Sequence, residues 1–195
     1  MFHASHSSQP PKTSETFKAI FGQIATSQKF RCCNSHYLKK ESLLDFELSN
    51  YNLGDHRIQV SPANGTVKEL RQVIRVPAKP LDSFDIVRSD KPLAVKIDTQ
   101  GAEPFVIAGG RKTLARAQLI VLEWCPFMIA KMGSDPLVVL EFLRSSFGLG
   151  RISQAEASAE AGQFMTIDQT CDLLFHTIAA EMNNEKYYVD IIAMK

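Results

Sequence analysis

The sequence predicts an α/β fold that contains a parallel βαβ unit. Two short apolar runs, at 94–98 and 119–124, have the length and composition of buried strands. The segment between them is long enough for one helix, and strands that pair in parallel need a crossover connection of this kind. The two strands are therefore expected to lie next to each other in one sheet.

Charged residues stand where each of these strands ends. Lys96 and Asp98 close the first run, Glu103 follows a turn that contains Gly101, and Glu123 closes the second run. In open parallel sheets, ligands bind outside the carboxyl ends of the strands. These charged side chains are therefore predicted to meet at a binding edge.

The spacing of apolar residues predicts the other helices. Phe17, Ile20, Phe21 and Ile24 recur at helical spacing. A helix over 102–108 should break at Gly109-Gly110, with 111–116 resuming as a separate turn or two. Helices are also expected from the Ser-Asp-Pro entry at 134–136 to Gly148, and over 171–182, whereas 155–162 reads as a loop or a mobile helix.

Further strands are expected at 30–34, 43–48, 72–76 and 187–194. The strand at 72–76 should stop at Pro77, because proline cannot donate a hydrogen bond to the ladder. No internal repeat and no convincing second domain is found.

Composition and charge limit the kinds of partner and compartment that the sequence favours. A chain of 195 residues fits one domain, and a formal net charge of +1 gives no long-range attraction to nucleic acid or to an anionic membrane. No apolar run approaches the about 20 residues of a membrane span. Residues 1–14 lack the apolar region of a signal peptide and are expected to be a disordered lead. Four cysteines without Cys-x-x-Cys spacing favour reduced thiols in a cytoplasmic protein, and no cluster of ligands predicts a metal site.

Four short motifs follow one another along the chain. The third reads Lys-Ile-Asp-Thr-Gln-Gly-Ala-Glu at 96–103 and is followed by Val-Ile-Ala-Gly-Gly at 106–110. The others lie at 49–58, 76–84 and 188–193. From about Thr16 to the C-terminus, the chain resembles the FkbM family of S-adenosylmethionine-dependent methyltransferases, whose members carry Lys-Ile-Asp-x-(Glu or Gln)-Gly-x-Glu.

The resemblance implies a Rossmann-like class I methyltransferase sheet. In such folds a glycine-rich first strand–turn–helix holds the methionine part of the cofactor, and an acidic residue at the end of the second strand holds the ribose. Gly22 is the only glycine before Gly54, so neither feature is found here. We therefore expect a methyltransferase domain over 15–195 that lacks the first βαβ unit, as a fragment, a mis-started gene or a degenerate paralogue.

The resemblance also implies catalytic roles for the residues at the strand ends. Asp98 is expected to orient or deprotonate an acceptor hydroxyl, with Lys96, Glu103 and Glu123 as its partners. Each has a structural alternative. Asp98 would cap the following helix, Glu103 would favour the positive end of that helix, and Glu123 would form a salt bridge with Lys96.

The cofactor implied by the resemblance is S-adenosylmethionine. Asn34 and Ser35, at the end of the predicted strand 30–34, would line the adenine pocket, and Asp98 would complete the cofactor contacts. Because the glycine-rich loop is not found, the chain is expected to bind this cofactor poorly. The strand at 94–98 should present an unpaired edge through which the chain self-associates.

The loop at 52–57 concentrates polar groups and is the candidate site for the substrate. Arg57 would bind a carboxylate or phosphate, and His56 is of a residue type that titrates near neutral pH. Asn52 and Asp55 complete this set. A generic turn with an exposed basic residue is the alternative.

The function predicted in this way is methyl transfer to a hydroxyl group of a sugar or of a secondary metabolite. The rival is a catalytically inactive remnant that does not bind the cofactor. The missing glycine loop favours the rival, whereas the intact segment 98–103 favours the enzyme. A third class, an enzyme acting on a nucleotide sugar or a dinucleotide, would need the same missing glycines.

Overall fold

The computed structural model describes residues 41–50, 56–59, 71–84, 92–153 and 163–195. All of them belong to the larger of two units into which the chain divides, Cys32–Lys195. The predicted lead at 1–14, the helix near Phe17, the strand at 30–34 and the segment 155–162 lie outside the described residues, and the domain boundary at residue 15 stays a prediction.

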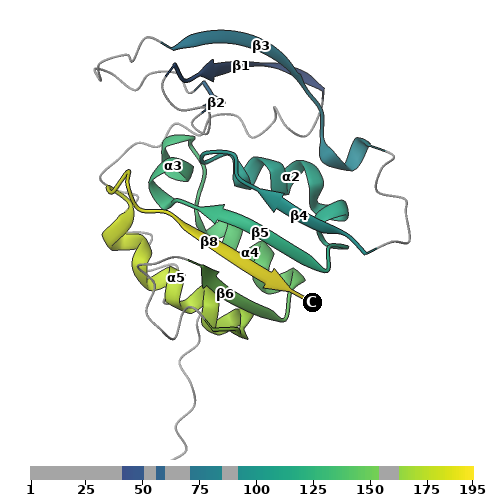
Figure 1. The fold of residues 1–195 in the computed structure, drawn as a ribbon, viewed down its shortest axis with the longest axis vertical. Helices are drawn as coiled ribbons and strands as arrows, with labels where there is room; N and C mark the ends of the chain where they lie inside the picture. Colours follow the sequence, from purple (N-terminus) through teal and green to yellow (C-terminus); the bar gives the residue numbers. More distant parts are fainter. Residues whose placement is uncertain (1–40, 51–55, 60–70, 85–91, 154–162) are drawn as a thin grey trace, which may run out of the picture. The chain divides into compact units, whose positions relative to one another are not determined.

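The larger of the two described sheets has five strands in the order β4-β5-β8-β6-β7 (Figure 1). β4 and β5 pair in parallel, with Ala94 opposite Leu119 and Ile97 opposite Leu122, which confirms the predicted parallel pair. β8 runs antiparallel to both β5 and β6. The strands are β4 (Ala94–Ile97), β5 (Leu119–Trp124), β8 (Val189–Met194), β6 (Leu149–Ser153) and β7 (Met165–Thr166).

Side chains alternate between the two faces of this sheet, as the period of a strand requires. On one face Ile120, Leu122 and Trp124 of β5 are fully buried and belong to the core with residues of the helices, such as Ile107 and Leu143. On the other face alternate residues of β5 and β8 are only half-buried. The helices are α2 (Glu103–Leu114), α3 (Pro126–Lys131), α4 (Leu137–Ser146) and α5 (Ile167–Glu181), and Figure 1 shows α4 behind the sheet.

A second, antiparallel sheet has three strands in the order β2-β1-β3. β1 (Ser42–Leu48) and β3 (Gln72–Ala78) confirm two predicted strands, and β2 (Arg57–Ile58) adds a short third one. The prediction that β3 stops at Pro77 is wrong, because the strand continues to Ala78 with Pro77 opposite Leu43. β3 is an edge strand of this sheet, and at an edge a missing N–H group leaves no partner unsatisfied.

The predicted break at Gly109-Gly110 is a kink within one helix. α2 continues to Leu114, but Gly110 has non-helical backbone angles, with φ −128° and ψ 16°. A short 3-10 turn, η1 (Leu81–Ser83), packs against this point, and a Cβ atom on Gly110 would lie 2.8 Å from Cδ2 of Leu81. The interruption therefore depends on a segment about 30 residues earlier in the chain as well as on the two glycines.

Five elements of the described residues were not predicted, namely β2, η1, α3, β6 and β7. Two expected boundaries also shift, since α5 begins at Ile167 and β8 at Val189. A capping box sets the start of α5, in which the Thr166 side chain and the Gln169 side chain each bond the other residue's backbone N–H. None of the helices in the described part of the chain is long and apolar enough to cross a membrane.

Candidate active site at the strand ends

A tight turn over residues 98–102 joins β4 to α2. Gln100 and Gly101 both have positive φ angles, 54° and 97°. A Cβ atom on Gly101 would lie 2.6 Å from the backbone carbonyl group of Met128. Glycine at position 101 therefore meets two requirements, a left-handed backbone and a close approach to α3.

Glu103 closes this turn from inside. Its side chain is buried, with the residue 1% exposed. Its Oε1 accepts hydrogen bonds from Thr99 N at 2.8 Å, Thr99 Oγ1 at 3.0 Å and Gly101 N at 3.3 Å. Its Oε2 is also buried and has no hydrogen-bond partner. Burial raises the pKa of Glu103 in spite of the three hydrogen bonds, which act in the opposite direction.

Asp98 points its carboxylate toward the exposed side of the turn. Oδ2 lies 3.0 Å from Lys96 Nζ, and Oδ1 accepts a hydrogen bond from Gln100 Nε2 at 3.3 Å. The hydrogen bond with Asp98 raises the pKa of Lys96. The N-cap of α2 is Ala102, and no side chain caps the helix there. The helix-capping alternative for Asp98 is therefore wrong, and its carboxylate is held beside the helix start by side chains alone.

Glu123 lies beside Asp98 at the end of the adjacent strand. Its Oε2 accepts a hydrogen bond from the same Gln100 Nε2 at 3.2 Å. The salt bridge considered between Glu123 and Lys96 is replaced by the ion pair of Lys96 with Asp98. On the other side of Glu123, the register of β5 with β8 places Asp190 directly opposite.

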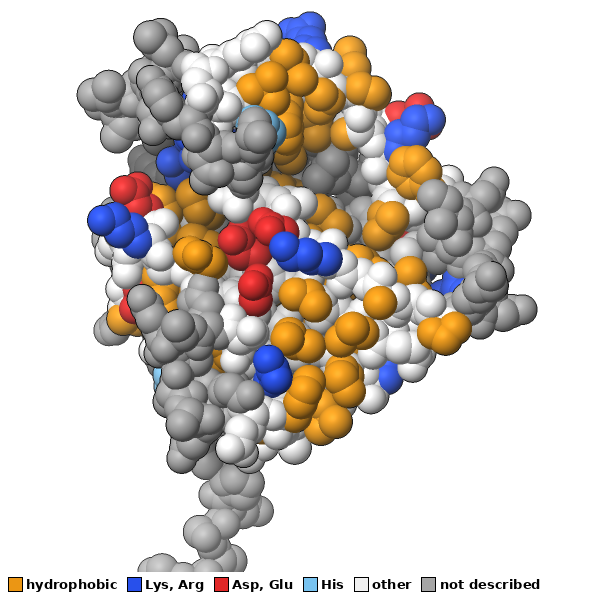
Figure 2. Space-filling view, in the orientation of Figure 1, with side chains coloured by type: hydrophobic (Ala, Val, Ile, Leu, Met, Phe, Trp, Pro, Cys, Tyr) orange, Lys and Arg blue, Asp and Glu red, His pale blue; other side chains and the backbone are white. Residues whose placement is uncertain are grey.

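Burial and these neighbours make Glu123 a weaker acid than an ordinary glutamate. Burial first, and then the charges of Asp98, Glu103 and Asp190, raise the pKa of Glu123 to about 7, against the opposite effect of Lys96. Figure 2 shows acidic side chains gathered beside a basic one, above an apolar patch, on the face of the five-stranded sheet turned to the viewer. A carboxyl group that is close to half protonated at neutral pH is able both to donate and to accept a proton.

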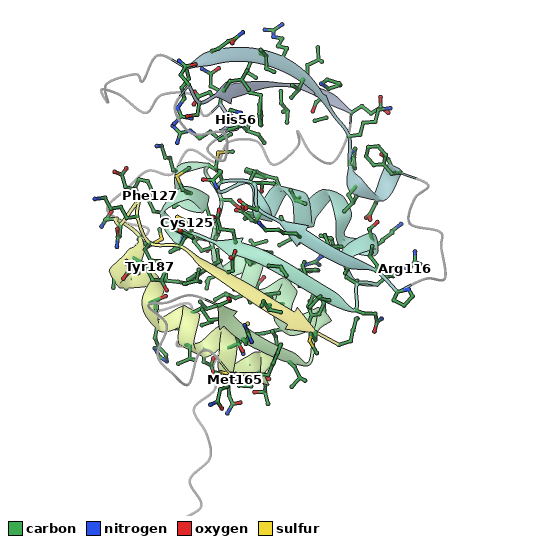
Figure 3. All side chains as sticks on the ribbon, in the orientation of Figure 1. His56, Arg116, Cys125, Phe127, Met165 and Tyr187 are labelled. Atoms are coloured by element: carbon green, nitrogen blue, oxygen red, sulfur yellow. The ribbon has the colours of Figure 1, made fainter. Side chains whose placement is uncertain are left out.

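Cys125, labelled in Figure 3, follows the strand that carries Glu123 and is the N-cap residue of α3. Its thiol is free and buried, and burial raises its pKa to about 11. Cys171 is also free and buried, with a pKa raised to about 12 by burial. Both thiols are therefore protonated at neutral pH and are poor nucleophiles.

Two residues of this site, Gln100 and Asp190, were not predicted as site residues. Gln100 was part of the family motif, but its left-handed backbone is not visible in the sequence. Asp190 interrupts the apolar positions of the last strand, and alternation places it on the same face as Ile192 and Met194. An acidic residue within an apolar strand is the signal that would have identified it.

The predicted substrate residues lie partly in the three-stranded sheet. Arg57 Nε donates to Glu47 Oε2 at 3.3 Å, across the β1–β2 pair. His56, labelled in Figure 3, accepts a hydrogen bond from Ser49 N at its Nδ1, at 3.0 Å. Asn52 and Asp55, like the predicted cofactor residues Asn34 and Ser35, lie outside the described residues. A shared site of the loop 52–57 with Asp98 stays a prediction.

Comparison with protein families gives one result. A family model described as "Methyltransferase FkbM domain" matches residues 10–148, which is more than half of the chain and includes the turn between β4 and α2. No curated protein and no solved structure gives a significant match.

Proposed function

Because this chain belongs to the FkbM methyltransferase family, we propose that it transfers a methyl group from S-adenosylmethionine to a hydroxyl group of a small molecule, a sugar or a secondary metabolite. The observation that carries this proposal is the position of Asp98. Its carboxylate stands exposed at the end of β4, where ligands bind in sheets of this kind, and it serves no helix cap.

Asp98 takes the proton of the acceptor hydroxyl. Each of its two oxygens accepts one hydrogen bond in the free protein, from Lys96 or from Gln100. A carboxylate oxygen has two acceptor sites, so each oxygen keeps one for an incoming hydroxyl. Lys96 forms an ion pair with this carboxylate and orients it, which is the role of a partner rather than of a second base.

Glu123 is the second proton carrier of the site. With a pKa of about 7 it is able to receive the proton from Asp98 or release one to solvent at neutral pH. Glu103 differs from both, because it is buried and bonded to the turn itself. Its role in this proposal is to stabilise the conformation of the 98–102 turn.

The described residues fit the reactive part of the proposed methyl donor. S-adenosylmethionine supplies a methyl group on a positively charged sulfonium, and at the strand ends three carboxylates, Asp98, Glu123 and Asp190, outnumber the single amine of Lys96. An excess of negative charge of this kind favours a cation. For the adenosine part, Asn34 and Ser35 remain the proposed contacts.

A methyl-transfer assay with labelled donor tests this function. The chain is incubated at millimolar S-adenosylmethionine, because weak binding is expected, with a panel of hydroxylated sugars and secondary metabolites. We expect label in at least one acceptor, and Asp98→Asn should lower turnover about 10²-fold or more. Donor affinity, measured by calorimetry, should fall far less than turnover does, and Asp168→Asn on the exposed side of α5 is the matched control.

Two outcomes would contradict the proposal. If the unsubstituted chain transfers no label to any acceptor and calorimetry detects no donor binding, the chain is an inactive methyltransferase-like remnant. If transfer occurs but Asp98→Asn and Asp168→Asn behave alike, Asp98 is not the proton acceptor.

A further inference from the structure

Gln100 has a backbone conformation that its residue type does not favour. Its φ of 54° lies in the left-handed region, where side chains with a Cβ atom are uncommon. Gly101 follows it with a positive φ of its own, so the turn already contains one glycine. A second glycine would satisfy the backbone at position 100 with less strain. The backbone alone therefore gives no reason for a glutamine here.

The side chain of Gln100 provides a reason. Its Nε2 donates to Asp98 Oδ1 at 3.3 Å and to Glu123 Oε2 at 3.2 Å. A primary amide nitrogen carries two hydrogens, so one is available for each carboxylate. The left-handed backbone places this nitrogen between the ends of β4 and β5, which are neighbours in the sheet.

In this chain the residue between the two carboxylates is a neutral donor. Glu123 already faces Asp98, Glu103 and Asp190, and Lys96 is bonded to Asp98. A glutamate at position 100 would be an acceptor only and would add another negative charge. A glutamine connects the two carboxylates without changing the charge of the site.

We propose that Gln100 is a positioning residue that couples Asp98 to Glu123 through its amide group, so that the two carboxylates act as one proton-transfer pair. The part of this inference that concerns catalysis rests on the proposed methyl transfer. The coupling itself does not, because it is a property of the free protein. The two are therefore tested separately.

Carboxyl titration by ¹³C NMR, on the chain without donor or acceptor, tests the coupling. The variants are Gln100→Met, which removes the amide at similar size, and Gln100→Gly, which also relieves the backbone. The matched control is Gln118→Met, at the exposed residue that precedes β5. Because a lost donor disfavours the charged form, the pKa of Glu123 should rise by about half a unit or more in both variants. Gln100→Glu should raise it further, and the control should leave it unchanged.

Thermal unfolding of the same variants separates this role from a structural one. Gln100→Gly should unfold at the same or a higher temperature than the unsubstituted chain and still shift the titration of Glu123. If neither Gln100→Met nor Gln100→Gly moves the pKa of Glu123 relative to Gln118→Met, the coupling does not exist and the inference is overturned, whatever the activity.

The assay of methyl transfer then tests the catalytic part. In an active chain, Gln100→Met should lower turnover about 10-fold with little change in the KM of the acceptor, and it should move the pH at which turnover is half-maximal. An unchanged turnover and pH profile, together with a shifted titration, would overturn the positioning role. Absence of transfer by the unsubstituted chain contradicts the proposed function, whereas the titration still decides the coupling.

Discussion

Carboxylates occur in two regions next to α2, and their surroundings differ. At the contact of η1 with α2, Asp82 receives backbone hydrogen bonds from Thr113 at 2.8 Å and Lys112 at 3.1 Å. At the ends of β4 and β5, Asp98 and Glu123 share a single amide nitrogen, that of Gln100. The first region supplies a donor for each oxygen of its one carboxylate. The second region brings several carboxylates together, and Glu123 receives a donor at only one of its oxygens.

The acidities of the two regions shift in opposite directions. Burial acts to raise the pKa of Asp82, but the hydrogen bonds from Thr113 and Lys112 outweigh it and the pKa is lowered. Burial and three like charges raise the pKa of Glu123. In β5 and β8, moreover, Glu123 and Asp190 face each other directly, which destabilises a strand pair.

Asp82 therefore stabilises the fold, whereas the crowded carboxylates at the strand ends destabilise it. Asp82 accepts hydrogen bonds from two backbone N–H groups that follow the kink at Gly110. Among the described residues, Asp98, Glu123 and Asp190 accept no hydrogen bond from a backbone N–H group. Perturbed, crowded ionisable groups at the edge of a sheet are typical of functional sites.

The largest effect on stability is expected at Glu103, which belongs to the turn between the two regions. Glu103→Ala leaves three donors in a buried place without an acceptor, and should lower the free energy of unfolding by about 3 kcal/mol or more. Glu103→Gln keeps an acceptor oxygen and removes a buried charge. It should change the free energy of unfolding by less than about 1 kcal/mol. Urea unfolding measures both, and equal losses would show that the hydrogen bonds of Glu103 do not hold the turn.

A smaller loss is expected at Asp82. Asp82→Ala removes two hydrogen bonds to the start of a helical segment and should cost about 1 kcal/mol at pH 7. Because the folded pKa is lowered, this stabilisation is present above the unfolded pKa of 3.8 and is lost as the pH falls through the folded value. Unfolding at pH 7 and near pH 2 checks this. A cost that stays the same at both pH values would contradict the capping role of the carboxylate.

Substitution of Glu123 should raise the stability of the protein at high pH rather than lower it. A folded pKa of about 7 against 4.5 in the unfolded chain means that the contribution to stability is present below pH 4.5 and is lost as the pH rises through 7. Glu123→Gln should therefore stabilise the protein at pH 8 by about 1–2 kcal/mol, allowing for solvent screening, and change little below pH 4.5. The control is Glu185→Gln, on an exposed residue. If Glu123→Gln instead loses stability at pH 8, the crowding of carboxylates at the strand ends does not destabilise the fold.

The parts of the fold that were predicted correctly depend on local sequence. The apolar runs of β4 and β5, the start of α4 after Pro136 and the apolar spacing of α5 all lie within single segments. β6 contains Gly150 and Arg151 and has little alternation, and α3 has six residues, so neither gives a clear pattern. The kink of α2 at Gly110 lies against Leu81 and Asp82, which no local pattern connects to it.

In the candidate site, too, some residues could be predicted from local sequence and others could not. Lys96, Asp98, Glu103 and Glu123 could be predicted because each stands at the end of an apolar run or just after it. The structure shows that their surroundings differ, since Glu103 is buried and Asp98 is exposed. Gln100 and Asp190 join the site through a backbone angle and a strand register, and both are set by packing between segments far apart in the chain.

The smallest effect on stability is expected at Asp98, and its measurement tests the central claim most directly. Asp98→Ala removes an exposed ion pair with Lys96 and also relieves the repulsion on Glu123, so the two effects nearly cancel. Urea unfolding at pH 7, side by side with Asp82→Ala, should give a change within about 0.5 kcal/mol for Asp98→Ala, against a loss of about 1 kcal/mol for Asp82→Ala. An equal or larger loss for Asp98→Ala would show that Asp98 stabilises the fold, and would remove the reason to assign it to catalysis.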